Sequence, residues 1–184
     1  DLFFSRKIGL DASGQRVPII GGGRLSGKVN NTSFGFLNMF TDEVNEGEVT
    51  TIQKNNFTVA RVSHQFAQRS YFGGMFVNRA GMGDQEDDYN RTLAVDGRWG
   101  FGKKAQLFGF YSKTITPGDS ISTDAFRLQG NYEWNGLRLN LSYQEVSEGF
   151  NPEVGFLLRS AYRKPEVMVF KQVRMNGKYG LLEL

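Results

Sequence analysis

The sequence predicts an all-β fold, an antiparallel up-and-down transmembrane β-barrel or a fragment of a larger one. The first observation is a series of segments, about ten residues long, in which apolar and polar side chains alternate. Side chains of a strand point to opposite faces with a period of two residues, so each segment would have one apolar and one polar face. The second observation is that short turns and long loops alternate between these segments, as they do in outer-membrane barrels.

Residues 124–144 give the clearest pattern. Asn135-Gly136 divides this stretch into two alternating runs, and this dipeptide favours a two-residue type I′ turn. The turn predicts the pairs Trp134–Leu137 and Tyr132–Leu139 on the apolar face, and Glu133–Arg138, Asn131–Asn140 and Gln129–Ser142 on the polar face. The two faces of this hairpin are therefore chemically unlike.

Seven further segments bring the number of expected strands to nine, and no stretch has helical periodicity. They are residues 19–29, 34–40, 57–63, 70–78, 91–101, 106–112 and 164–174. Bacterial single-chain barrels have even strand numbers, so nine strands suggest a truncated barrel or a strand not recognised.

The connections are predicted to be sorted by length. Long loops are expected at residues 41–56, 80–88, 114–123 and 145–163, and short turns at 64–68, 102–104 and 135–136. In a meander this order brings all long loops to one end of the sheet. A soluble sandwich has no reason to sort its loops in this way.

Five charged residues on the polar faces are the predicted lumen-facing positions: Asp96, Arg98, Arg127, Glu133 and Arg138. They are too charged for a dry core. In a membrane barrel they would line a wet lumen, and the apolar face would meet lipid. The alternative is a soluble β-sandwich or barrel that serves as a binding module, with the apolar face packed against another sheet. We favour the barrel.

Three aromatic residues beside short turns, Trp99, Phe101 and Trp134, are predicted to anchor the barrel at one membrane interface. The alternative is that they are core aromatics at one end of a sandwich. In the longest loop, Phe150, Asn151, Pro152 and Glu153 belong to a stretch too apolar for a freely moving loop. We expect it to fold inward as a constriction or plug, or to dock a partner; equally, its later part could be a strand leading into Arg163.

Composition excludes several other functions. There is no cysteine, so no disulfide scaffold is expected. The net charge is +3 without a basic run, which argues against nucleic-acid binding. No stretch of eighteen apolar residues occurs, so no membrane helix is expected. His64 is the only histidine, and without cysteine or a second histidine it is a poor candidate for a zinc site. It is also a poor candidate for the histidine of a catalytic triad. The acidic residues of 84–88 lack the spacing of an EF-hand loop. We predict no enzymatic activity, no catalytic or metal-binding residues and no cofactor.

Several segments resemble, in order, a little-characterised family of bacterial outer-membrane β-barrels that follow a family-9-type carbohydrate-binding domain. They are residues 3–9 (FFSRKIG), 17–22 (VPIIGG), 58–62 (TVARV), 89–92 (YNRT) and 149–156 (GFNPEVGF), the last being the most specific. The resemblance covers nearly the whole chain, which would correspond to the barrel region alone and to a fragment lacking N- and C-terminal parts.

The resemblance implies a place in the outer membrane of a Gram-negative bacterium and a role in transport or outer-membrane assembly. The implied partners are the lipid bilayer and, beyond it, other outer-membrane proteins or glycans. The family has no established activity and no catalytic residues that could be assigned to positions in this chain.

Overall fold

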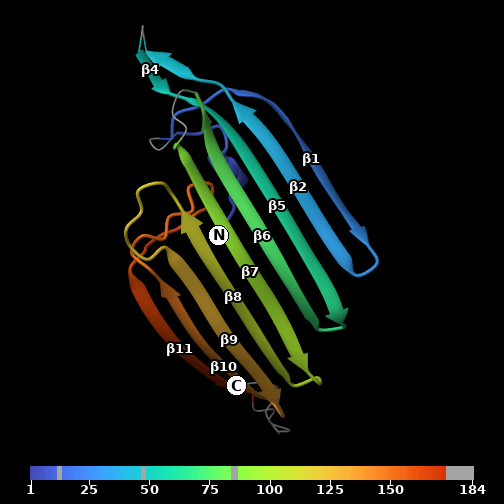
Figure 1. Ribbon diagram of the computed structural model, residues 1–184. Coiled ribbons are helices and arrows are strands. Elements are labelled where there is room, and N and C mark those ends of the chain that lie inside the picture. Colours follow the sequence, from blue (N-terminus) through green and yellow to red (C-terminus); the bar gives the residue numbers. More distant parts are fainter. Residues whose placement is uncertain (12–13, 47–48, 84–86, 173–184) are drawn as a thin grey trace, which may run out of the picture.

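The computed structural model describes residues 1–11, 14–46, 49–83 and 87–172. Nine strands form one antiparallel sheet, and each strand pairs with its neighbours along the chain once a small separate hairpin is set aside (Figure 1). The strands of the large sheet are β1 (Ile19–Val29), β2 (Thr32–Thr41), β5 (Lys54–Ala67), β6 (Ser70–Met82), β7 (Tyr89–Phe101), β8 (Ala105–Ile115), β9 (Asp124–Trp134), β10 (Leu137–Val146) and β11 (Tyr162–Lys171). The prediction of an all-β, antiparallel, up-and-down sheet is confirmed.

Two elements were not expected from the sequence. A hairpin of β3 (Val44–Glu46) and β4 (Val49–Ile52) lies within the loop between β2 and β5, and a 3₁₀ turn, η1 (Ser5–Lys7), lies near the start of the chain. Among the described residues, no helix is both long enough and apolar enough to span a membrane.

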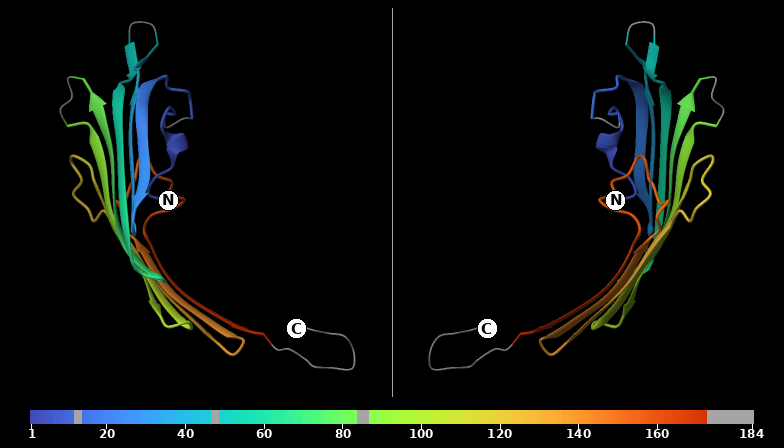
Figure 2. Two further views of the ribbon diagram at one scale, coloured as in Figure 1. Left: turned by 90° about the vertical axis from the view of Figure 1, so that its right-hand side faces the viewer. Right: turned by 90° about the vertical axis from the view of Figure 1, so that its left-hand side faces the viewer.

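The sheet is curved but open (Figure 2). Strands β1 and β11 form its two edges, and within the described residues each pairs with one neighbour only. These nine strands therefore do not by themselves form the closed barrel that the sequence pattern suggested. The predicted end of the last strand, at residues 173 and 174, lies outside the described residues.

The hairpin of β9 and β10 has the predicted register. Trp134 pairs with Leu137, and Glu133 pairs with Arg138. The remaining predicted pairs, Tyr132–Leu139, Asn131–Asn140 and Gln129–Ser142, are also present. Asn135 and Gly136 have φ angles of 48° and 76°, the left-handed conformation that a type I′ turn requires at both positions.

The alternation of short and long connections is as predicted, although the turn expected at 64–68 is shorter, because residues 64–67 belong to β5. Short turns at residues 30–31, 68–69, 102–104 and 135–136 lie at one end of the sheet, which we call the turn end. Longer connections at 42–53, 83–88, 116–123 and 147–161 lie at the other, the loop end.

Two segments cover the concave face of the sheet at the loop end: residues 1–10 and 147–158, here called the inner layer (Figure 2). The buried core lies between this layer and the sheet. One cluster joins Ile8 and Val154 to Phe57, Val59 and Val77. A second cluster joins Phe150 to Ala125 and Val146. The convex face has no such cover among the described residues.

Candidate functional site

The concave face carries all five charged residues that the sequence predicted to face a lumen. Opposed residues of an antiparallel pair share a face. Asp96 pairs with Phe110, which pairs with Arg127, and the cross-strand pair of Glu133 and Arg138 belongs to the same face. Arg98 follows two residues after Asp96 on β7 and thus has the same orientation.

Asp96 is paired on this face with Arg61 of β5. The two side chains form a bidentate ion pair in which Arg61 Nη2 lies 2.8 Å from Asp96 Oδ2, and Nη1 contacts Oδ1. The guanidinium of Arg98 lies over the ring of Tyr71, 5.2 Å from its centroid. The pair of Asp96 and Arg61 was not predicted, because the hydrophobic pattern of β5 gives no sign of its partner across β6.

The inner layer is one hydrogen-bonded unit. Phe4 N donates to Val154 O over 2.8 Å, and Phe156 N donates to Asp1 O over 2.8 Å. Phe150 and Pro152 are buried, whereas Asn151 is exposed and Glu153 is partly buried. The loop thus folds onto the sheet and has no strand before Tyr162. Whether it restricts passage along the concave face stays a prediction.

Arg79 of β6 is the main ionic link between the sheet and the inner layer. Its Nε lies 2.5 Å from Glu153 Oε2, and its Nη2 lies 2.6 Å from Asp88 Oδ1. Its Nη1 donates to Asn55 Oδ1 over 3.0 Å. One guanidinium therefore connects β5, the 83–88 loop and the inner layer. Asp84 and Glu86 of the predicted acidic loop lie outside the described residues.

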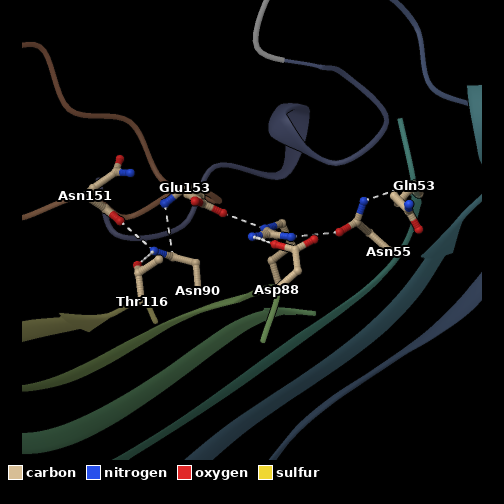
Figure 3. Close-up of polar contacts among 8 residues, drawn as sticks. Gln53, Asn55, Asp88, Asn90, Thr116, Asn151 and Glu153 are labelled. Atoms are coloured by element: carbon tan, nitrogen blue, oxygen red, sulfur yellow. Dashed lines mark hydrogen bonds and ion pairs between the residues drawn. The ribbon is translucent and has the colours of Figure 1, made fainter. Parts of the chain in front are cut away.

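Asn90 of β7 forms the second polar link (Figure 3). Its side-chain nitrogen donates to Asn151 O and to Thr116 Oγ1, each over 2.9 Å, and its Oδ1 accepts from Glu153 N over 3.3 Å. The side chain is 1% exposed. Sequence reasoning missed both Arg79 and Asn90, because alternation assigns each side chain to a face but does not indicate which residues of the inner layer it meets.

A hollow of about 800 Å³ lies at the loop end between the inner layer, the ends of β2 and β5, and β4. It is lined by polar side chains that include Thr41, Gln53, Asn55 and Arg79. At its rim Asp42 accepts from the backbone N–H of Glu43 and pairs with Lys54, and these two contacts lower the pKa of the Asp42 carboxyl.

A second hollow, of about 570 Å³, lies at the turn end over β8 to β11. It is lined by Arg69, Lys103, Lys104 and Arg138, together with the amide side chains of Gln106, Asn131 and Asn140. Within the ranges that the structure describes, no group of three or more His, Cys, Asp or Glu side chains could hold a metal ion. His64 lies on the convex face, bonded through Nδ1 to Thr32 Oγ1 over 2.9 Å and packed against Phe72.

The predicted anchor residues Trp99, Phe101 and Trp134 are more than half exposed on the convex face at the turn end. Trp99 stacks with Phe101 at a centroid distance of 6.2 Å and meets Phe66 edge-on at 5.4 Å. We call Phe66, Phe72, Trp99, Phe101 and Trp134 the aromatic belt. Their position at one end of the sheet matches the prediction, and their contact with a membrane interface stays a prediction.

A polar row marks the opposite margin of the same face. Asn38, Thr58, Asn78 and Arg91 lie in register on β2, β5, β6 and β7. Asn38 Nδ2 donates to Thr58 Oγ1 over 2.9 Å, and Arg91 Nε donates to Asn78 Oδ1 over 3.3 Å. Most of the exposed apolar side chains of the convex face lie between this row and the aromatic belt; Phe40 and Met82 lie beyond the row, toward the loop end.

Comparison with known proteins found no relative: no protein-family model, no curated protein and no solved structure matches this chain. The resemblance to an outer-membrane barrel family therefore stays a prediction, and the function has to be argued from the sheet itself.

Proposed function

We propose that the nine-stranded sheet is part of the wall of a transmembrane β-barrel in the outer membrane of a Gram-negative bacterium. The convex face meets lipid, and the concave face lines an aqueous lumen. The barrel serves in transport or in outer-membrane assembly, with glycans among its cargo, and has no enzymatic activity.

The observation that carries this proposal is the exposed apolar surface of the convex face. Large hydrophobic side chains stand uncovered there on every strand of the sheet. Examples are Leu25, Phe36, Val95, Leu128 and Val167, with exposed fractions of 63, 47, 60, 52 and 71%. Apolar surface on this scale marks a contact with another protein or with a membrane.

The width of the apolar zone supports a membrane. On β7 the polar row is represented by Arg91 and the aromatic belt by Trp99, eight residues further along the strand. At about 3.3 Å per residue this is roughly 26 Å along the strand. A strand tilt of about 40° shortens it to about 20 Å, which is close to the apolar band of about 25 Å on outer-membrane barrels.

The concave face supports a lumen. On β9 and β10 its turn-end half carries amides, hydroxyls and charges, which suit water and not a dry core. On β11 the same face carries the exposed apolar side chains of Met168 and Phe170. The inner layer fills the loop-end half and is held by Arg79 and Asn90. Barrel lumens that are closed in this way by a chain segment occur in outer-membrane proteins.

A membrane also requires that the two edges be paired. The backbone groups of β1 and β11 that point away from the sheet have no strand partner among the described residues. In lipid, each backbone group without a hydrogen-bond partner costs on the order of several kcal/mol. Barrels in membranes therefore close completely, so that every backbone group is paired. The proposal therefore requires further strands, from the same chain or from another copy, between β11 and β1.

The experiment is cysteine labelling of the protein reconstituted in lipid vesicles, since the chain has no cysteine of its own. Leu128 and Gln129 are neighbours on β9 with side chains on opposite faces. We expect Leu128→Cys to react with a lipid-soluble maleimide and to resist a water-soluble one, and Gln129→Cys to show the reverse. Leu141→Cys and Asn140→Cys form a second matched pair on β10.

The same preparation should migrate differently in gel electrophoresis before and after boiling, as closed barrels do. Equal reactivity of Leu128→Cys and Gln129→Cys toward the water-soluble reagent would contradict the membrane proposal. Together with a monodisperse product in plain buffer, that result would favour the alternative, a soluble binding module whose convex face is covered by a partner.

A further inference from the structure

The hollow at the turn end collects basic side chains from separate parts of the chain. Arg69 comes from the turn between β5 and β6, Lys103 and Lys104 come from the turn between β7 and β8, and Arg138 comes from β10. The four short turns together carry three basic side chains and no acidic one. The turns therefore add positive charge to this end of the sheet without adding negative charge.

Arg69 is held in place over β7. Its Nη1 donates to Gly102 O over 2.6 Å. Its side chain passes over Gly100, where a Cβ would lie 2.6 Å from Arg69 Cβ. The absence of a side chain at Gly100 thus makes room for Arg69 to reach across the strand toward the hollow.

Most of this positive charge is not neutralised. Of the described residues that line the hollow, Glu133 alone is acidic, and it pairs with Arg138 over 3.3 Å between two largely exposed side chains. Pairs of this kind contribute little. In the part of the chain that the structure describes, the side chains of Lys103 and Lys104 make no ion pair or hydrogen bond.

Polar groups continue from the hollow up the concave face. Asn140 donates to Asn131, Gln129 donates to Asn131 over 3.2 Å, and Arg127 Nη2 donates to Gln129 Oε1 over 2.7 Å. Arg127 Nε is buried and has no hydrogen-bond partner among the described residues. This chain of hydrogen bonds thus begins at the cations of the hollow and ends at the guanidinium of Arg127, whose Nε is an unused donor.

We propose that this hollow binds a soluble phosphate-bearing solute. Guanidinium groups match phosphate oxygens in pairs, lysine ammonium groups add charge, and amides supply further donors. The hollow opens on the concave face, where Met168 and Phe170 of β11 also line it, so the solute reaches it from water and not from the bilayer. The phosphate-bearing solute is thus a ligand class for the concave face. The proposal rests on the proposed function in one respect: it treats the concave face as the wall of a lumen.

The test is calorimetric titration of the detergent-solubilised protein with inorganic pyrophosphate at low ionic strength. The intact chain should bind, and Lys103→Gln/Lys104→Gln should weaken binding about tenfold, because two charge contacts with the phosphate groups are lost. Added salt should weaken binding by screening. The control, Arg6→Gln/Arg16→Gln, removes two exposed charges at the loop end and should bind like the intact chain.

Two further variants keep the test decisive if the lysine double variant does not fold. Arg138→Gln should weaken binding several-fold, and Gly100→Ala should do so by displacing Arg69. No binding by the intact chain, equal weakening in Arg6→Gln/Arg16→Gln, or binding only to micelles containing phosphatidylglycerol would overturn the proposal. The cysteine labelling of the two faces does not depend on this outcome, so failure here leaves the membrane proposal separately testable.

Discussion

Arg79 of β6 and Glu153 of the inner layer form an ion pair across 74 residues of sequence, with Nε and Oε2 2.5 Å apart. The same guanidinium lies 2.6 Å from Asp88 Oδ1. The Arg79 side chain is only 17% exposed, so these two carboxylates, and not water, chiefly balance its positive charge. One cation thus holds the loop-end connections against the sheet.

Arg79→Gln should destabilise the protein by roughly 1–3 kcal/mol, because the hydrogen bonds to two charged partners are lost and both carboxylates are left without their cation. The denaturation midpoint would measure this, and protease should cut the inner layer faster. Arg163→Gln is the control: Arg163 pairs with Glu145 over 2.9 Å but is 75% exposed, so its loss should cost less than about 1 kcal/mol. Equal costs for both variants would contradict the role of Arg79.

Asn90→Asp should also loosen the inner layer. Asn90 is buried, and a carboxylate there cannot donate to Asn151 O or Thr116 Oγ1, so both hydrogen bonds are lost. A loss of roughly 1–3 kcal/mol is expected. Hydrogen exchange of the Glu153 amide should report it locally. Asn78→Asp, at a position facing the exposed side chain of Arg91, should leave that exchange unchanged.

Gly155→Ala should separate the two segments of the inner layer. A Cβ at this position would lie 2.6 Å from Asp1 O and 2.9 Å from Leu2 O, both backbone atoms that cannot move aside alone. A cost of roughly 1–3 kcal/mol is expected for such a forced fit, visible as faster proteolysis of residues 1–10. Gly130→Ala meets no atom within 4 Å and serves as the control. A stable Gly155→Ala protein with unchanged proteolysis would show that the segments are not held this closely.

Leu128→Arg should cost roughly 2–4 kcal/mol in lipid vesicles if the residue lies near the bilayer midplane, since a charge there faces hydrocarbon. Gln129→Arg places the same charge on the concave face and should cost little. Unfolding by guanidinium in vesicles would compare the two. A difference that persists unchanged in plain aqueous buffer would indicate packing against protein and not lipid.

Trp99→Phe and Trp134→Phe each leave a single tryptophan, because the chain has two. In vesicles, both remaining tryptophans should be quenched most by lipids brominated close to the headgroup, since the aromatic belt is expected at the membrane interface. Deep quenching by bromine near the acyl ends would place the belt within the hydrocarbon. If bromine quenched neither tryptophan at any depth, the aromatic belt would not lie in the membrane.

Much of the sheet could be predicted because its determinants are local. The Asn135-Gly136 turn sets the register of β9 and β10 directly, and strict alternation makes a slip of one residue unfavourable. The polar face of each strand and the alternation of short turns and long loops could likewise be predicted from neighbouring residues in the sequence. The β3–β4 hairpin was missed because its strands are too short to show alternation within a polar loop.

The candidate sites were harder to predict, because their residues meet through the curvature of the sheet. Nothing near Arg79 in the sequence indicates Glu153, and nothing near Arg69 indicates Arg138. The five charged positions on the concave face were found since period-two alternation is enough to assign a face. Closure of the sheet was not predictable, since alternation is the same in an open and in a closed sheet.

The hydrogen bond from Asp1 N to Phe156 O joins groups 155 positions apart, whereas strands β9 and β10 are joined by a two-residue turn. Bringing distant segments together costs more chain entropy than closing a hairpin, and local contacts form first. The meander should therefore fold before residues 1–10 dock. During that interval the core residues Phe57 and Val77 are uncovered, so the docking of residues 1–10 is the folding step most exposed to misassembly.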